Sequence, residues 1–242
     1  FTHRELATHV VRAREAGLIS FSGMKLDKLR TLAGIVKQGR VEMIIAGGSL
    51  AMALRKARGE MEGDEATIGA AGLDANKGHK AYIPPSAVED ARKLLVDAKE
   101  KGVEIVLPID FVLDDGSVAE QIPDDKWQLD IGPKTRSHFD EKAKAWAAKT
   151  DRKVAFHNGV MGKFEVSTYA GGTEALVGTL KDLQQDGIDV YVGGGEGRAA
   201  LERFGSLDDI THAFTAGGTI LKALAGKPLP FLVALAEQSS RA

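Results

Sequence analysis

Six short apolar segments recur along the chain, and segments with helical periodicity separate them. The apolar segments lie at residues 18–21, 41–45, 103–107, 153–157, 188–192 and 210–214, and most of them end at or near glycine. Strands that are apolar on both faces are typical of parallel sheets, because helices then cover both sides of the sheet. The sequence therefore predicts an α/β fold with a doubly wound, six-stranded parallel sheet of the Rossmann-like kind.

The segments between these strands carry helix signals. Helices are expected at residues 27–37, 49–57, 86–101, 135–149, 173–185 and 198–204. The strongest signal begins at Ser86, where Glu89 completes a capping box. Residues 58–83 are polar and glycine-rich, so we expect a surface excursion there. No internal repeat or linker divides the sequence. We therefore interpret residues 1–242 as a single nucleotide-binding-type α/β domain that starts with a helix at 1–16.

Composition excludes several classes of protein. The 32 lysine and arginine residues nearly balance the 34 aspartate and glutamate residues, and no dense basic block occurs. We therefore expect no nucleic-acid partner. No apolar run is long enough to span a membrane. The chain has no cysteine, which excludes disulfides and thiolate metal sites within it. We expect an intracellular protein, in the cytoplasm or in an organelle matrix.

A run of glycines at Gly193, Gly194 and Gly195 follows one of the predicted strands and precedes Glu196 and a predicted helix. Glycine lets the backbone turn tightly and approach a ligand, and the first N–H groups of a helix attract an anion. The turn therefore predicts a phosphate-binding site. An ordinary strand-to-helix turn is the simpler interpretation of an isolated Gly-Gly-Gly, so the rest of the chain has to decide between the two.

Five motifs, in order along the chain, resemble those of the phosphoglycerate kinase family. They read Leu-Asp-Ile-Gly-Pro-Lys-Thr at 129–135, Asn-Gly-Val-Met-Gly-Lys-Phe-Glu at 158–165, Val-Gly-Gly-Gly-Glu at 192–196, Thr-Ala-Gly-Gly at 215–218 and Leu-Ala-Gly-Lys-Pro-Leu-Pro at 224–230. The resemblance covers nearly the whole chain but only the nucleotide-binding C-terminal half of that two-domain enzyme. Residues 1–6 resemble the start of the helix that links the two halves.

The resemblance implies an activity and a set of site residues. In that family ATP lies across the strand ends, and its terminal phosphoryl group passes reversibly to 3-phosphoglycerate with the help of Mg²⁺ and a lysine. The resemblance places an adenine pocket at Gly47 and Gly48. It places nucleotide contacts at Asn158, the ribose at Glu165, and the metal at Glu196. Phosphates would lie against the backbone of Gly193, Gly194, Gly195, Gly217 and Gly218.

Several positions depart from the family pattern. The family's catalytic lysine falls on Met24 in an ungapped alignment, and a one-residue gap brings Lys25 there instead. Glu196 replaces an aspartate, which matters because Mg²⁺ tolerates little change in ligand geometry. Gly197 replaces a threonine or serine of the family. Gln128 replaces a glycine of the adenine pocket, and Val160 replaces a proline. The basic residues that hold 3-phosphoglycerate lie on the family's other domain, and this sequence has no counterpart of them.

Two main hypotheses follow. The chain is a phosphoglycerate-kinase-like domain that binds ATP or ADP with Mg²⁺, is completed by a missing N-terminal domain and is inactive alone. Alternatively, it is a catalytically decayed subunit, a pseudoenzyme with a structural or binding role in a larger assembly. A small-molecule kinase with another acceptor is a third possibility. For single residues the simpler interpretations are a surface lysine at Lys25, a turn cap at Asn158 and a solvated carboxylate at Glu165; we expect His157 to be a core or rim residue.

Overall fold

The computed structural model describes residues 5–64, 66–215 and 217–227. Its centre is a parallel sheet of six strands in the order β3-β2-β1-β7-β8-β9. The strands are β1 (Leu18–Phe21), β2 (Met43–Ala46), β3 (Glu104–Val106), β7 (Val154–Asn158), β8 (Asp189–Gly193) and β9 (His212–Phe214). The predicted fold class is confirmed, and each predicted strand forms within a few residues of its expected place.

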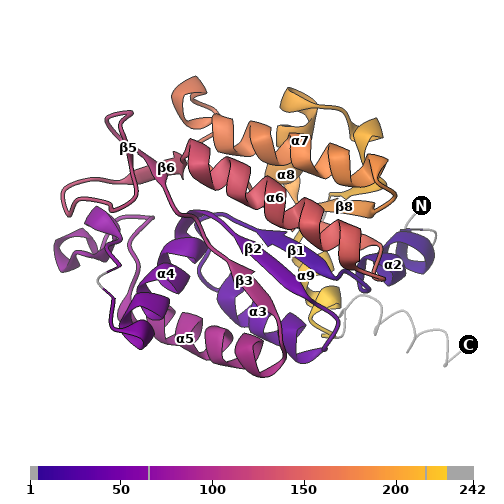
Figure 1. Cartoon of the computed structure of the whole chain (residues 1–242), viewed down its shortest axis with the longest axis horizontal. Coiled ribbons are helices and arrows are strands. Elements are labelled where there is room, and N and C mark those ends of the chain that lie inside the picture. Colours follow the sequence, from indigo (N-terminus) through magenta and orange to yellow (C-terminus); the bar gives the residue numbers. More distant parts are fainter. Residues whose placement is uncertain (1–4, 65, 216, 228–242) are drawn as a thin grey trace, which may run out of the picture.

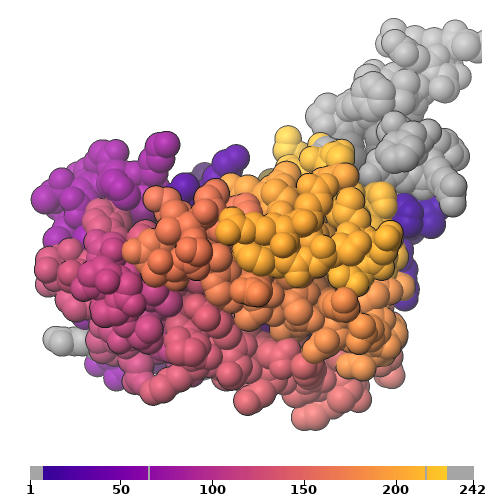
Figure 2. All heavy atoms as spheres, turned by 90° about the horizontal axis from the view of Figure 1, so that it is seen from above, coloured from indigo at the N-terminus to yellow at the C-terminus, as the bar shows by residue number. Residues whose placement is uncertain are grey.

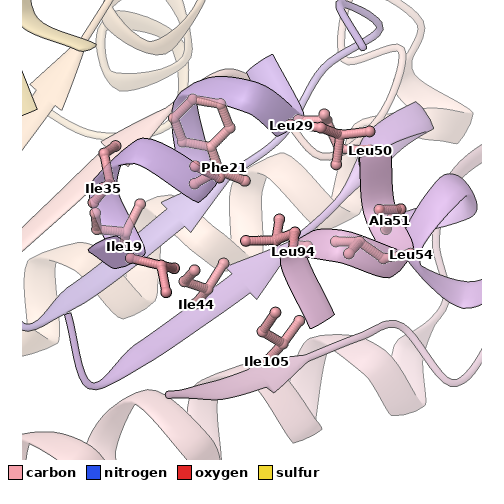
Figure 3. Close-up of a cluster of buried hydrophobic side chains, with 14 of the residues drawn as sticks. Ile19, Phe21, Leu29, Ile35, Ile44, Leu50, Ala51, Leu54, Leu94 and Ile105 are labelled. Carbon is pink, nitrogen blue, oxygen red and sulfur yellow. The ribbon is translucent and has the colours of Figure 1, made fainter. Parts of the chain in front are cut away.

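Helices cover both faces of this sheet (Figure 1). One face carries α3 (Lys28–Lys37), α4 (Gly48–Glu62), α5 (Pro85–Glu100) and α9 (Gly217–Leu224), and the other carries α6 (Pro133–Lys149), α7 (Gly171–Gln185) and α8 (Gly195–Phe204). Each face packs a hydrophobic core: the first core lies under α3, α4, α5 and α9, and the second under α6, α7 and α8. In β1, Ile19 and Phe21 point into the first core and Leu18 into the second. This alternation of side chains along a strand lets one short strand fill two cores. Figure 3 shows the first core, where Ile19 and Phe21 pack with Ile44, Leu50 and Leu94.

The sequence did not predict a second, antiparallel sheet. It contains β4 (Phe111–Leu113), β5 (Val118–Ala119) and β6 (Gln128–Ile131) in the order β5-β4-β6. A turn at residues 114–116 joins β4 to β5, and Gly116 adopts a φ of +82° there. These strands and the short 3-10 helices Gly69–Gly72 and Asp74–Asn76 lie together at one end of the molecule (Figures 1 and 2).

The start of α5 and the end of α4 differ from the sequence prediction. The capping box at Ser86 and Glu89 is wrong: α5 begins at Pro85, and no side chain caps its first turn. Proline suits the first helical position because it needs no N–H partner there, so Ser86 is already inside the helix. Helix α4 extends to Glu62 rather than ending at residue 57, and stops where Gly63 adopts a φ of +78°.

The amino-terminal segment is only partly the predicted helix. Residues Glu5–Val10 form a π-helix that continues into the short helix α2 (Val11–Ala13). The start of the predicted linking helix, residues 1–4, lies outside the described residues, as do residues 228–230 of the last motif and Ala216. Two further 3-10 helices, Ser167–Tyr169 and Leu207–Asp209, lie in loops. Within the described residues no helix is both long and apolar enough to cross a membrane.

Candidate functional site

The carboxyl ends of the parallel strands meet at one edge of the sheet, which is where open α/β sheets bind ligands. A pocket of about 570 Å³ opens at this edge. It is lined by the turn between β1 and α3, the ends of β7 and β8, and the first residues of α8 and α9. Of the predicted site residues, the lining contains Lys25, Asn158, Gly193, Gly194, Gly195, Glu196, Gly217 and Gly218.

Two glycine turns touch each other beside this pocket. Gly194, with a φ of +94°, precedes α8, and Gly217 begins α9. A Cβ atom on Gly217 would lie 2.8 Å from Cα of Gly194 and 3.1 Å from Nδ2 of Asn158. No residue larger than glycine fits there without displacing the neighbouring backbone. This close approach brings the amino ends of α8 and α9 to the same pocket, and both helix starts favour an anion there.

Other glycines of the site are not required by packing. A Cβ atom on Gly195 or Gly218 would meet nothing within 4 Å. Both residues line the pocket, so their small size leaves room at the amino ends of α8 and α9. The first N–H groups of an α-helix have no partner within the helix. The structure therefore offers open space next to backbone donors, which is the arrangement that a phosphate group needs.

A hydrogen-bonded chain forms one wall of the pocket. The Lys28 ammonium donates to Oδ1 of Asn158 over 2.8 Å and to the carbonyl of Ser22 over 3.2 Å. Asn158 in turn donates from Nδ2 to the carbonyl of Gly193 over 2.6 Å. Asn158 is 5% exposed, so both ends of its amide are held. This series of hydrogen bonds fixes the charge of Lys28 next to the glycine turn that begins at Gly193.

Charge in the pocket is mixed. The lining contains three lysines, Lys25, Lys28 and Lys222, and two acids, Asp27 and Glu196. Burial lowers the pKa of Lys28; the negative charge of Glu196 opposes this, and the positive charge of Lys25 adds to it. The lysines outnumber the acids three to two, so the pocket is suited to an anionic ligand such as a phosphate group.

His157 precedes Asn158 and is a buried core residue, as predicted. Its Nε2 lies 2.7 Å from the carbonyl oxygen of Gly159, and its Nδ1 lies 3.1 Å from Oγ of Ser20. A carbonyl only accepts, so Nε2 carries the proton and Nδ1 accepts from the serine hydroxyl. Burial lowers the pKa of His157 to about 4, which keeps the ring neutral near pH 7. His157 thus supports the turn at Gly159 and does not line the pocket.

The remaining predicted residues lie outside this lining. A Cβ atom on Gly47 would overlap Sδ of Met161, and one on Gly48 would lie 2.8 Å from backbone atoms of Gly23. Both glycines are therefore required by packing within the protein. Glu165 is exposed. Gln128 is the first residue of β6, where it is half-buried and pairs with Leu113.

Comparisons with known proteins identify the family of the chain. The family model for phosphoglycerate kinase matches residues 5–227. The chain belongs to the phosphoglycerate kinase family. It is 35% identical over 220 residues to the phosphoglycerate kinase of Thermosynechococcus vestitus, covering 86% of this chain and 50% of the relative. It is 32% identical over 222 residues to the cytosolic phosphoglycerate kinase of Triticum aestivum, covering 87% of this chain and 50% of the relative.

A solved structure shows the same fold. The phosphoglycerate kinase from Coxiella burnetii superposes with a TM-score of 0.74 at 23% identity, over all of this chain and 57% of the other. The chain thus spans about half the length of the curated phosphoglycerate kinases that it matches.

Lys28 is the site residue that the sequence analysis missed. It lies in the same strand-to-helix turn as Lys25, three residues further along the chain, so its position in the sequence contained a signal. The family's catalytic lysine aligns with Met24 or Lys25, so the resemblance predicted a role for those positions and not for Lys28. The structure instead buries most of Lys28 and bonds it to Asn158, while Met24 is 57% exposed.

The acids of the pocket fit a magnesium ion that a nucleotide would bring. Among the described residues no group of three or more His, Asp or Glu side chains could hold a metal by itself. Mg²⁺ in phosphate-transfer sites commonly takes one or two carboxylates, with water and phosphate oxygens as its other ligands. Glu196, in the first turn of α8, and Asp27 both line the pocket and would hold such an ion together with a phosphate.

Proposed function

We propose that this chain is a phosphoglycerate-kinase-type nucleotide-binding domain. Its activity would be reversible phosphoryl transfer between ATP and 3-phosphoglycerate, once an N-terminal half supplies the acceptor site. The observation that carries the proposal is the open space at Gly195 and Gly218, beside two helix amino ends and Lys28. Phosphoryl transfer requires mainly positioning and charge neutralisation, and this pocket offers both.

Five of the lining residues take a role in the proposal. Backbone N–H groups at Gly195 and Gly218 bind the nucleotide phosphates, and Lys28 neutralises part of their charge. Lys25, at the pocket mouth, is the candidate for the lysine that stabilises the transferring group. When bound, Mg²⁺ would supply further charge neutralisation, with Glu196 as the carboxylate that orients it. The roles of Gly47 and Gly48 with adenine, and of Glu165 with ribose, rest on the family resemblance alone.

A calorimetric titration with ADP and ATP, with and without Mg²⁺, tests this proposal. We expect weak binding by the chain, and Lys28→Met should weaken it about tenfold or more, because a buried charge partner of phosphate typically contributes 1.5–3 kcal/mol. Lys77→Met is the matched control, since Lys77 pairs with Asp74 on the surface and is not part of the pocket lining. Equal ADP affinities for the two variants would refute the proposed phosphate site.

We expect the chain alone not to phosphorylate 3-phosphoglycerate. Nothing in its sequence matches the family's basic acceptor residues, and positioning alone can account for about 7–11 kcal/mol of a barrier. A coupled assay for ADP release measures this directly. Turnover at an enzymatic rate by the purified chain would contradict the expectation.

A decayed subunit with a structural role is the second candidate function, and one observation favours it. Gly197, which replaces the family's threonine or serine, has no room for a side chain: a Cβ atom there would lie 2.8 Å from Cγ1 of Val192. The packing of β8 against α8 therefore leaves no space at residue 197 for the hydroxyl-bearing side chain of the family. Absence of ADP and ATP binding in the calorimetric experiment, with or without Mg²⁺, would favour this candidate.

A further inference from the structure

Asp130 is a buried carboxylate on β6 that the proposed chemistry does not use. Its side chain is fully buried. Oδ2 accepts a hydrogen bond of 2.7 Å from the N–H of Gly172, in the first turn of α7, and Arg136 of α6 lies 3.4 Å away. Asp130 therefore joins the second sheet to the starts of two helices on one face of the main sheet.

The other oxygen of this carboxylate is enclosed by two glycines. A Cβ atom on either Gly162 or Gly172 would overlap Oδ1 of Asp130. Among the described residues Oδ1 has no hydrogen-bond partner. An enclosed oxygen of this kind costs free energy, and burial accordingly raises the pKa of Asp130 to about 6 despite the N–H groups of Gly172 and Ile131 and the charge of Arg136. Stability of β6 alone does not account for a carboxylate at this position.

Gly162 belongs to a loop at residues 159–165 that starts at the pocket. Further along it, the N–H of Lys163 donates to the carbonyl of Leu129 on β6 over 2.9 Å. Nearer the pocket, the carbonyl of Val160 accepts the hydroxyl of Ser22 over 2.6 Å. Asn158, directly before the loop, bonds Lys28. Three residues thus separate the contact with Asp130 from the wall of the pocket.

We propose that Asp130 is a positioning residue of the nucleotide site: by filling the space left by Gly162 and Gly172, it fixes the loop at residues 159–165 and, through it, Asn158. This inference rests on the proposed function. It adds Asp130 to the residues of the site. Asp130 belongs to the motif at residues 129–135, but the family resemblance assigns it no role. It predicts that damage at Asp130 loosens the loop and weakens nucleotide binding, beyond any general loss of stability.

The same region of the chain offers a matched control. Asp110 is also a buried carboxylate, 1% exposed, and it accepts backbone N–H groups at a helix start: those of Thr135 over 2.7 Å and Lys134 over 3.1 Å, in α6. A glycine, Gly132, makes room for it in the same way. Asp110 therefore matches Asp130 in burial and in capping a helix, but in the described part of the chain no hydrogen bond joins it to the loop at residues 159–165.

The experiment compares Asp130→Ala, Asp130→Asn and Asp110→Ala in the full chain. Hydrogen exchange measures opening of the loop, and calorimetry measures ADP affinity. We expect the amide of Lys163 to exchange about tenfold faster or more in Asp130→Ala, and ADP to bind about tenfold more weakly. Both should be near the values of the unsubstituted chain in Asp110→Ala. Asp130→Asn keeps an oxygen for Gly172 and should restore both.

Each other outcome decides against one of the two ideas. Unchanged loop exchange in Asp130→Ala, or faster exchange with unchanged ADP affinity, would overturn the positioning role. If the unsubstituted chain binds no ADP, the proposed function falls, and loop exchange still tests whether Asp130 fixes the loop. If Asp130→Ala does not fold, Gly172→Ala and its control Gly132→Ala press a methyl group against the two carboxylates from the starts of α7 and α6, outside the loop. Equal effects of this pair on the loop would also overturn the role.

Discussion

The substitution Gly195→Ala tests whether glycine is needed at the phosphate pocket for packing within the protein or for leaving space for a ligand. Gly195 is the first residue of α8, its φ is not in the left-handed region, and a Cβ atom there would meet no other atom within 4 Å. Alanine therefore fits the protein without strain. It would, however, place a methyl group in the space that we assign to a phosphate.

The two effects have opposite signs and separate magnitudes. Replacing glycine by alanine in a helix stabilises it by up to about 1 kcal/mol, which raises the melting temperature of a chain of this size by about 2–4 °C. A methyl group forced against a bound ligand typically costs about 1–3 kcal/mol. That corresponds to ADP affinity lower by about 5- to 150-fold.

Calorimetry of ADP binding and thermal unfolding followed by circular dichroism measure both quantities. Gly178→Ala is the control, because Gly178 is an exposed glycine of α7 with equally open surroundings and is not part of the pocket lining. Both variants should melt at a higher temperature, and only Gly195→Ala should bind ADP more weakly. If Gly195→Ala keeps the affinity of Gly178→Ala, ligand phosphates do not approach α8 and the reasoning is refuted.

Three further predictions concern the phosphate site, metal and pH. Because the pocket lining consists of glycine turns and lysines and does not include Gly47 or Glu165, tripolyphosphate should compete with ADP for the pocket in competition titrations; absence of competition would count against a phosphate site there. Glu196→Asp should increase the Mg²⁺ dependence of ADP binding in calorimetry, because it restores the shorter carboxylate of the family; an unchanged dependence would remove Glu196 from the metal site. The pKa of Asp130 is about 6 when folded, above the unfolded value of about 3.9, so its contribution to stability is fully present below about pH 4 and is lost as pH rises through 6. For His157 the folded pKa of about 4 lies below the unfolded value of about 6.5, so its contribution is present above pH 6.5 and is lost as pH falls towards 4. Urea unfolding of Asp130→Asn should therefore show a larger loss of stability from pH 7 to pH 4 than the unsubstituted chain, and an equal loss would count against the raised pKa of Asp130.

The sequence by itself determined the sheet and the edge at which the site lies. Predicted strands such as Val-Glu-Ile-Val-Leu at residues 103–107 carry apolar side chains on both faces, and that pattern is typical of a sheet covered on both sides. The same pattern predicts that the glycine turns after these strands lie together, because the carboxyl ends of parallel strands share one edge of the sheet. Local patterns of this kind survive in a single sequence, since each residue's neighbours along the chain carry the information.

Only the tertiary structure decided which residues share the pocket and what each glycine is for. Gly47 and Gly195 follow similar strands in the sequence, yet Met161 and Ser22 fill the space beside Gly47, while the space beside Gly195 is open. Lys28 reaches Asn158 across 130 positions of the chain, and Asp130 meets Gly162 and Gly172 from a separate sheet. Such contacts depend on how segments that are distant in the sequence pack against each other. The spacing of residues along the chain does not show which distant segments meet.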